Sequence, residues 1–277
     1  MLMGVLDLEE SSARTESDIF VGASHAMPSG RVFGGQVLGQ SVVAAARTVP
    51  ADRHPHSFHG YFLRPGDVTK QITFAIDRIH DGRSFSRRRI QAYQDGVPIF
   101  SGIASFQDED PGFEHAIPMP DVPAPEDLPD PADVQPSALR LLHSNPIEVR
   151  HTTGDIWATV DERTPRQSVW TRLRGPIGDD PLLHRAGLAY LSDFTIQEPA
   201  LRANGIAWTT PGLKQASLDH AIWWHRFARV DEWLLYVQES PSTQGGRGLC
   251  LGRLYRRDGV LVATVAQEVM ARLPDSA

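Results

Sequence analysis

Histidines are concentrated in one short segment, and imidazole is the side chain best suited to proton transfer near neutral pH. His54, His56 and His59 lie close together, with Pro55 beside the first. Side chains alternate between the faces of a strand, so His56 and His59 are expected on opposite faces, and proline disturbs the geometry next to His54. The spacing therefore argues against a metal site. His59 is a candidate substrate contact, acid or base, and the simpler interpretation is a hydrogen-bonded histidine near the core.

Two other groups of residues have chemical potential. The run Ser86-Arg87-Arg88-Arg89 offers guanidinium groups that suit phosphate oxygens, and Arg88 is a candidate substrate contact. On a strand these arginines alternate between faces, so a solvated outer face accounts for some of them. Cys250 lies between two leucines without an adjacent base, which indicates a small core residue and not a nucleophile.

Several common chemistries are excluded by inspection. The sequence has no Gly-x-Ser-x-Gly elbow, no phosphate-binding Gly-x-x-x-x-Gly-Lys loop and no His-Glu-x-x-His helix. These absences argue against α/β-hydrolases, P-loop nucleotidases and zincins. We expect neither a metal nor a cofactor.

Charge and cysteine content limit the partners and the compartment. A formal net charge of −7 argues against nucleic acid as a ligand. The first ten residues are acidic where a targeting segment would be basic, the C-terminal residues 274–277 are not a Ser-Lys-Leu address, and no apolar run is long enough for membrane insertion. The single cysteine cannot form an intramolecular disulfide, so a cytoplasmic protein is expected.

A proline-rich acidic stretch divides the 277 residues into two halves. Prolines recur between residues 108 and 136, where each fixes φ and removes a backbone donor, so an extended surface linker is expected. The predicted organisation is an N-terminal domain at 1–107, a linker at 108–145 and a C-terminal domain at 146–277.

The halves resemble distant copies of each other. Three matches recur at a nearly constant offset: Arg64 with Arg226 (226 − 64 = 162), Gly82 with Gly246 (246 − 82 = 164), and Asp95 with Asp258 (258 − 95 = 163). A constant offset at separate places indicates an internal duplication.

Each half is predicted to hold one helix followed by antiparallel strands. Residues 34–49 are almost wholly apolar, which indicates a buried helix, and 181–191 form its counterpart with Asp180 as the N-cap. The predicted strands are 57–63, 71–79, 84–93 and 98–106, then 217–224, 233–239, 248–256 and 260–271. The Asp95-Gly96 pair predicts a tight hairpin. One buried helix wrapped by a sheet, present twice, is an α+β double hot dog, although the pattern alone also fits other α+β folds.

Longer motifs resemble the bacterial thioesterase II family of acyl-CoA thioesterases and its peroxisomal relatives. They extend over nearly the whole chain and comprise residues 31–40, 56–67, 81–88, 190–193, 217–226, 232–236 and 258–268. The resemblance implies a double hot dog that hydrolyses fatty acyl-CoA, with assembly into a homo-oligomer, dimer or tetramer. It also implies a catalytic trio of aspartate, threonine or serine, and glutamine, which falls on Asp193, Ser217 and Gln267. Ser217 replaces the threonine that bacterial members usually have.

Those residue types suit thioester hydrolysis, which needs an oriented water and a carboxylate to take its proton. Asp193 falls at the C-terminal end of a predicted helix, where the helix dipole should raise the pKa of its carboxyl. Gly34 and Gly35 are candidate substrate contacts through free backbone N–H groups, or else allow close packing. Two alternatives stay open: a hot-dog hydratase or dehydratase that uses His59, and a non-catalytic acyl-CoA-binding protein.

Overall fold

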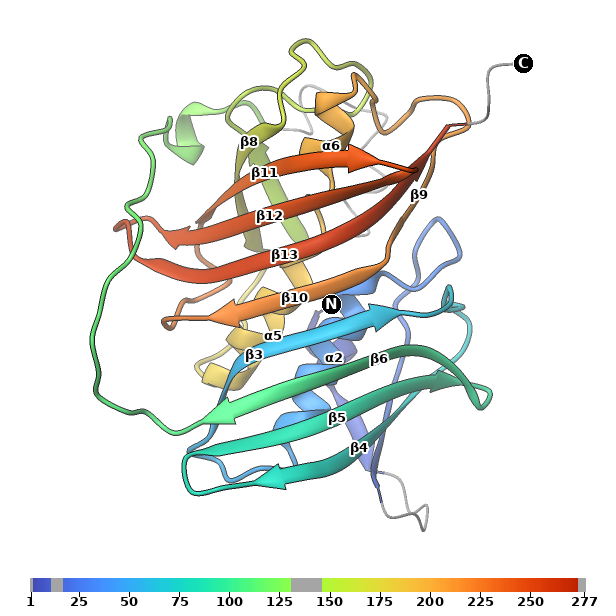
Figure 1. The fold of residues 1–277 in the computed structure, drawn as a ribbon, viewed down its shortest axis with the longest axis vertical. Helices are drawn as coiled ribbons and strands as arrows, with labels where there is room; N and C mark the ends of the chain where they lie inside the picture. Colours follow the sequence, from blue (N-terminus) through green and yellow to red (C-terminus); the bar gives the residue numbers. More distant parts are fainter. Residues whose placement is uncertain (1, 11–16, 131–145, 274–277) are drawn as a thin grey trace.

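The computed structural model describes residues 2–10, 17–130 and 146–273. Within them, one 13-stranded antiparallel sheet curves around two central helices (Figure 1). The first half contains α1 (Leu2–Leu6), β1 (Leu8–Glu10), β2 (Asp18–Gly22), α2 (Gly34–Ala46), β3 (His54–Phe62), β4 (Ile72–Asp81), β5 (Phe85–Gln94) and β6 (Val97–Gln107). The second contains β7 (Ile147–His151), β8 (Arg166–Leu173), α5 (Pro181–Ser192), α6 (Glu198–Ala203), β9 (Lys214–Ser217), β10 (Asp219–Trp224), β11 (Leu234–Gln244), β12 (Arg247–Arg256) and β13 (Leu261–Arg272).

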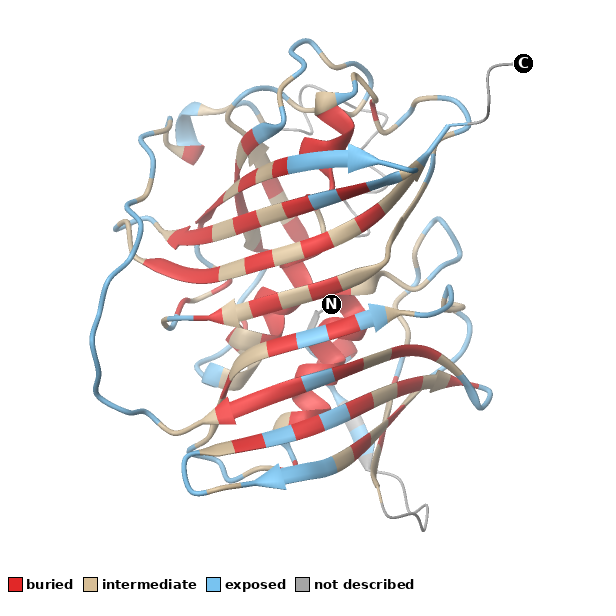
Figure 2. Cartoon of the chain, viewed as in Figure 1, coloured by how far each residue is buried: buried red, intermediate tan, exposed pale blue. Residues whose placement is uncertain are grey.

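The sheet order repeats between the halves and confirms the double hot dog. The strands run β1-β2-β4-β5-β6-β3-β10-β13-β12-β11-β8-β7, so β3 and β10 join at the centre and the flanking strands follow in equivalent order. At the junction His59 lies opposite Ala221. Buried and exposed residues alternate along the strands, as a sheet with one covered face requires (Figure 2). The β9 strand pairs separately with β13.

Helices α2 and α5 pack against each other inside the sheet, and their sequences explain the close contact. A Cβ atom added to Gly39 would lie 3.1 Å from the carbonyl oxygen of Ala186, so the two backbones nearly touch. The N-cap of α5 is Asp180, as predicted, and its side chain accepts the Leu182 N–H at 2.9 Å. Among the described residues no helix is both long and apolar enough to cross a membrane.

The predicted hairpin is present at Asp95-Gly96. Both residues have positive φ, 49° and 75°, the backbone that a tight two-residue turn between β5 and β6 demands. The corresponding connection in the second half, between Arg256 and Leu261, is longer, and there Gly259 has φ 87°.

The described part of the proline-rich stretch runs extended along the second half, apart from a short 3-10 helix, η1 (Pro125–Asp127). Its carbonyl groups are anchored: Trp170 Nε1 donates to Pro123 at 2.8 Å and Arg150 donates to Pro125 at 2.6 Å. Residues 131–145 of the predicted linker lie outside the described residues, as do the C-terminal residues 274–277.

Candidate active site

Asp193, Ser217 and Gln267 converge although they are far apart in the sequence. Asp193 caps the C-terminal end of α5, Ser217 ends β9, and Gln267 lies on β13. The Ser217 hydroxyl donates to Asp193 Oδ1 at 2.8 Å, and Gln267 Nε2 lies 2.9 Å from both Asp193 Oδ1 and Ser217 Oγ. The three polar heads form a closed triangle. Asp193 and Gln267 are buried and Ser217 is half-buried.

Burial controls the charge of the Asp193 carboxyl. It raises the pKa of Asp193 to about 6, because the ionised form is poorly solvated in the interior. Hydrogen bonds from Ser217, Gln267 and the Gly35 backbone N–H lower the pKa and only partly offset this effect. The expected direction of the shift is therefore present, but its main cause is desolvation and not the α5 dipole.

The Gly34-Gly35 pair allows the start of α2 to pack directly against the Asp193 carboxylate. A Cβ atom on Gly34 would lie 2.6 Å from Asp193 Oδ2, and one on Gly35 would lie 2.1 Å from the Tyr190 carbonyl oxygen. Real Cβ atoms do not approach so closely, so close packing requires glycine at both positions. The Gly35 N–H bonds to Asp193, and thus the first half of the chain contributes to a site whose side chains come from the second.

A buried layer behind the triangle contains residues that the sequence did not single out. His220 Nδ1 is hydrogen-bonded to Gln267 Oε1, and His220 Nε2 lies 3.0 Å from Ser192 Oγ. The Tyr236 hydroxyl donates to the Ser192 carbonyl oxygen at 3.0 Å. A signal for His220 was available: His220, Ile222 and Trp224 alternate along β10, so His220 had to face inward with two core residues.

His59 does not lie at the triangle. Its side chain is exposed on the outer face of the sheet, where the ring meets Trp223 edge to face with centroids 4.8 Å apart. The expectation of a histidine near the core is wrong, because the inward positions of this strand belong to Phe58 and Gly60. His56 is half-buried and bonds to Ser105 Oγ at 2.8 Å.

Arg88 also lies elsewhere. It is 1% exposed and donates to the hydroxyl and carbonyl oxygens of Thr48 and to Asp81 at 2.7 to 2.9 Å. Thr48 follows the C-terminal end of α2, roughly 18 Å along the helix from Gly34. Arg88 therefore links β5 to the end of α2 and stabilises the first half. Arg87 and Arg89 are exposed, as expected for part of this run.

The strand register shows one way in which the two halves differ. Arg88 lies opposite Ala104 in the first half, and Cys250 lies opposite Gln267 in the second (250 − 88 = 162; 267 − 104 = 163). The first half thus has an alanine where the second has the glutamine. Cys250 is a buried core residue, as predicted, and burial raises the pKa of its thiol to about 11.

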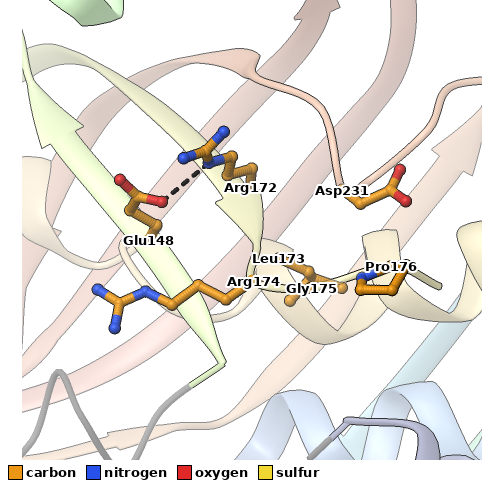
Figure 3. A pocket seen from close by; sticks show the side chains of 7 residues that line it. All are labelled: Glu148, Arg172, Leu173, Arg174, Gly175, Pro176 and Asp231. Atoms are coloured by element: carbon orange, nitrogen blue, oxygen red, sulfur yellow. Dashed lines mark hydrogen bonds and ion pairs between the residues drawn. The ribbon is translucent and has the colours of Figure 1, made fainter.

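Two surface cavities lie apart from the triangle. A cavity of 340 Å³ beside β7 and β8 contains Arg174 and an Arg172–Glu148 ion pair (Figure 3). A second, of 170 Å³, lies near His54 and Arg185. None of the three triangle residues lines either cavity, so neither is assigned to the acyl group. In the described ranges no cluster of histidine, cysteine, aspartate and glutamate is arranged to hold a metal.

Comparison with known proteins places this geometry in a family. Residues 23–107 match the acyl-CoA thioesterase N-terminal domain and residues 119–271 match the acyl-CoA thioesterase C-terminal domain. Human acyl-coenzyme A thioesterase 8 is 38% identical over 97% of this chain and 88% of its own. The crystal structure of an acyl-CoA thioesterase II from Mycobacterium marinum is 40% identical, covers 100% of this chain and 98% of its own, and superposes with a TM-score of 0.80.

At the level of fold alone, a hot-dog protein of unknown function from Alicyclobacillus acidocaldarius gives a TM-score of 0.78 at 21% identity, over 98% of this chain and 97% of its own. The two domain matches together span most of the sequence, in the order in which the two hot dogs occur. The chain therefore belongs to the acyl-CoA thioesterase family and is a thioester hydrolase of the thioesterase II type.

Proposed function

We propose that this protein hydrolyses fatty acyl-CoA to a fatty acid and CoA by direct attack of a water molecule on the thioester carbonyl. The observation that carries the proposal is the triangle of Asp193, Ser217 and Gln267, whose polar atoms lie 2.8 to 2.9 Å apart. Such a cluster suits one water and one proton acceptor, which is what thioester hydrolysis requires.

Each member has a distinct task in this proposal. The Asp193 carboxylate accepts a proton from the water as the water oxygen bonds to the carbonyl carbon. When the tetrahedral intermediate collapses, the carbon–sulfur bond breaks, and the thiolate leaves with its electron pair and takes up that proton. Ser217 and Gln267 hold the carboxylate and the water in an attacking geometry.

The pKa of Asp193 suits a general base. Because the ionised form is the active one, kcat/KM should fall about tenfold per pH unit once the pH drops below the pKa of about 6. A base whose pKa lies near the working pH combines ionisation with a strong tendency to take a proton.

The alternatives receive less support. A hydratase or dehydratase that uses His59 would need that ring near the bound thioester, but the ring lies on the outer face of the sheet. A non-catalytic acyl-CoA-binding protein would not need three polar heads in hydrogen-bonding contact. Product analysis separates the three functions: hydrolysis releases free thiol, a hydratase or dehydratase changes the acyl chain and keeps the thioester, and a binding protein leaves acyl-CoA unchanged.

The decisive experiment replaces the proposed base. Asp193→Asn should reduce kcat by about 10²- to 10⁴-fold, the usual range for the loss of a general base, without loss of the fold. Thiol release should be followed over a series of acyl-CoA chain lengths, which also defines the preferred substrate. Asp258→Asn, a surface change in the turn between β12 and β13, is the matched control and should keep wild-type rates. Normal hydrolysis by Asp193→Asn would refute the assignment.

We also infer that two or more copies assemble through the outer face of the sheet. Tyr61 is 64% exposed and Ile103 is 46% exposed, and both lie beside His59 and Trp223 at the centre of this face. A second copy that covers the patch would remove this apolar area from water. Light scattering should give at least twice the chain mass of 30.6 kDa, and Tyr61→Lys should reduce it. A wild-type monomer would contradict the inference.

We infer a cytoplasmic location from the single cysteine, which cannot form an intramolecular disulfide. Cell fractionation would test it.

A further inference from the structure

The orientation of the Gln267 amide decides whether the triangle can form. The amide nitrogen can donate two hydrogens, and it faces Asp193 Oδ1 and Ser217 Oγ, both 2.9 Å away. If the amide were flipped, its oxygen would face the carboxylate, and two acceptors would meet without a hydrogen between them. The ionised Asp193 therefore requires the amide nitrogen on its side.

His220 is placed to enforce this orientation. The pairing of β10 with β13 sets Ala221 opposite Ala266, which brings the preceding His220 beside Gln267. His220 Nδ1 bonds to the amide oxygen of Gln267 on the side away from Asp193. Next to His220, the Asp219 carboxylate accepts the backbone N–H of Glu268 at 2.7 Å. Two neighbouring residues of β10 therefore bond to two neighbouring residues of β13, Gln267 and Glu268.

The hydrogen bonds also fix the tautomer of the ring. The amide oxygen can only accept, so His220 Nδ1 must carry a hydrogen. The ring is buried, and burial lowers the pKa of His220 to about 4, so it is neutral at neutral pH and Nε2 carries none. The Ser192 hydroxyl, 3.0 Å from Nε2, then donates to the ring. The same hydroxyl donates to the Ala189 carbonyl oxygen at 3.0 Å, so its hydrogen is shared between the two acceptors.

We propose that His220 is a positioning residue for the hydrolysis: in its neutral Nδ1–H form it locks the Gln267 amide with the nitrogen toward Asp193 and Ser217. This assignment rests on the function proposed above. Ser192 donates to His220, His220 donates to Gln267, and Gln267 donates to Asp193 and Ser217, so the hydrogen bonds run in one direction from the end of α5 to the catalytic carboxylate.

The lock has a chemical purpose during turnover. Once Asp193 has taken a proton, a flipped Gln267 could accept a hydrogen bond from the new carboxylic acid and stabilise the protonated form. Without His220, this flip would raise the pKa of Asp193 and delay the return of its proton. With His220 in place, flipping would set the amide nitrogen against the Nδ1–H of the ring, where two donors meet.

Two substitutions of similar size test whether His220 acts by placing a hydrogen-bond donor or only by filling space. The amide nitrogen of His220→Asn can occupy the place of Nδ1 and keep the donor to Gln267, whereas the amide nitrogen of His220→Gln reaches the place of Nε2. We expect His220→Gln to reduce kcat about 10²-fold with KM little changed, because the catalytic groups are misplaced and not the substrate. His220→Asn should recover most of that loss. The acid limb of kcat/KM should move to higher pH in His220→Gln and stay in place in His220→Asn.

A spectroscopic measurement on the wild type keeps the test independent of how the variants fold. With ¹⁵N-labelled histidine, the two ring nitrogens of His220 should show the Nδ1–H tautomer from pH 6 to 8. The Nε2–H tautomer, or a charged ring in this range, would overturn the proposal.

The proposal about His220 and the proposed function fail in different ways. Equal kcat and equal acid limbs in His220→Gln and the wild type, with Asp193→Asn inactive, would remove only the role of His220. Full activity of Asp193→Asn would remove the proposed function itself, whatever the tautomer.

Discussion

Asp193 lies between two helix ends that act on its carboxylate in opposite directions. The C-terminal end of α5 disfavours negative charge there, and the start of α2 favours it by donating the Gly35 N–H. Burial acts in the same direction as the α5 end, outweighs the Gly35 N–H and raises the pKa to about 6. A base that is mostly ionised at neutral pH, and still basic enough to take a proton from water, results from this balance.

The same shift predicts how stability depends on pH. The pKa of Asp193 rises from 3.8 unfolded to about 6 folded, so the folded protein binds this proton more tightly. Its contribution to stability is present at low pH and is lost as the pH rises from about 4 to about 6. The full loss is up to roughly 3 kcal/mol. The free energy of unfolding should therefore fall with pH in the wild type relative to Asp193→Asn.

Urea unfolding of both proteins between pH 4 and pH 7.5 measures this difference and cancels the titration of other groups. A difference that stays constant over this range would show that Asp193 has an ordinary pKa in the folded protein.

The candidate site could be predicted from the sequence only in part. Asp193, Ser217 and Gln267 came from motif resemblance, since nothing local distinguishes Gln267 from other polar strand residues. His220 and Ser192 were missed because their importance arises from hydrogen bonds across 28 and 47 residues of sequence, which no local pattern reveals. His59 and Arg88 were chosen by residue type, but the sheet places one outside and the other at the far end of α2.

The main helices and hairpins were predicted well because local rules determine them. The apolar run of α2, the Asp180 cap of α5 and the Asp95-Gly96 turn need little tertiary information.

By contrast, β8 and α6 were missed, because Gln167, Glu198 and Arg202 are polar and yet buried. Gln167 Nε2 lies 2.7 Å from Glu198 Oε2, and Arg202 Nε lies 3.2 Å from Gln167 Oε1. These hydrogen bonds offset the cost of burying the polar side chains. Elements whose buried positions are polar lack the apolar periodicity by which helices and strands are recognised in a sequence.

The contact between α2 and α5 predicts a sharp response at Gly35. Gly35→Ala would place its Cβ atom 2.1 Å from the Tyr190 carbonyl oxygen, which belongs to the helix backbone and cannot rotate away. The helices must then separate, at a cost of about 3 kcal/mol or more. The shift should also move the N–H that supports Asp193, so kcat should fall together with the melting temperature.

Gly112→Ala is the matched control for this change. Nothing lies within 4 Å of its added Cβ atom, so stability should change by less than about 0.5 kcal/mol. Equal melting temperatures for Gly35→Ala and Gly112→Ala would contradict the helix contact.

At the scale of the molecule, the duplicated halves share one sheet and one helix pair. The β3–β10 junction continues the sheet between them, and α2 supplies the Gly35 N–H to the carboxylate of the second half. The division at 1–107, 108–145 and 146–277 stays a prediction, and the structural continuity indicates that these parts are not independent in stability. We therefore expect the halves to unfold together.

The distribution of tryptophan allows this to be tested. All six tryptophans, at positions 157, 170, 208, 223, 224 and 233, belong to the second half. Trp223 also contacts His59 at the junction, so tryptophan fluorescence reports mainly on the second half. Phe74→Ala removes a fully buried ring from β4 in the first half and should destabilise by about 3 to 5 kcal/mol. If the halves unfold as one unit, the tryptophan transition must move to lower denaturant by the same amount as the circular dichroism transition. Phe113→Ala, at a fully exposed phenylalanine, should move neither. A tryptophan transition that stays at its wild-type midpoint in Phe74→Ala would show two independent domains, because the lost packing would then weaken only the half that contained it.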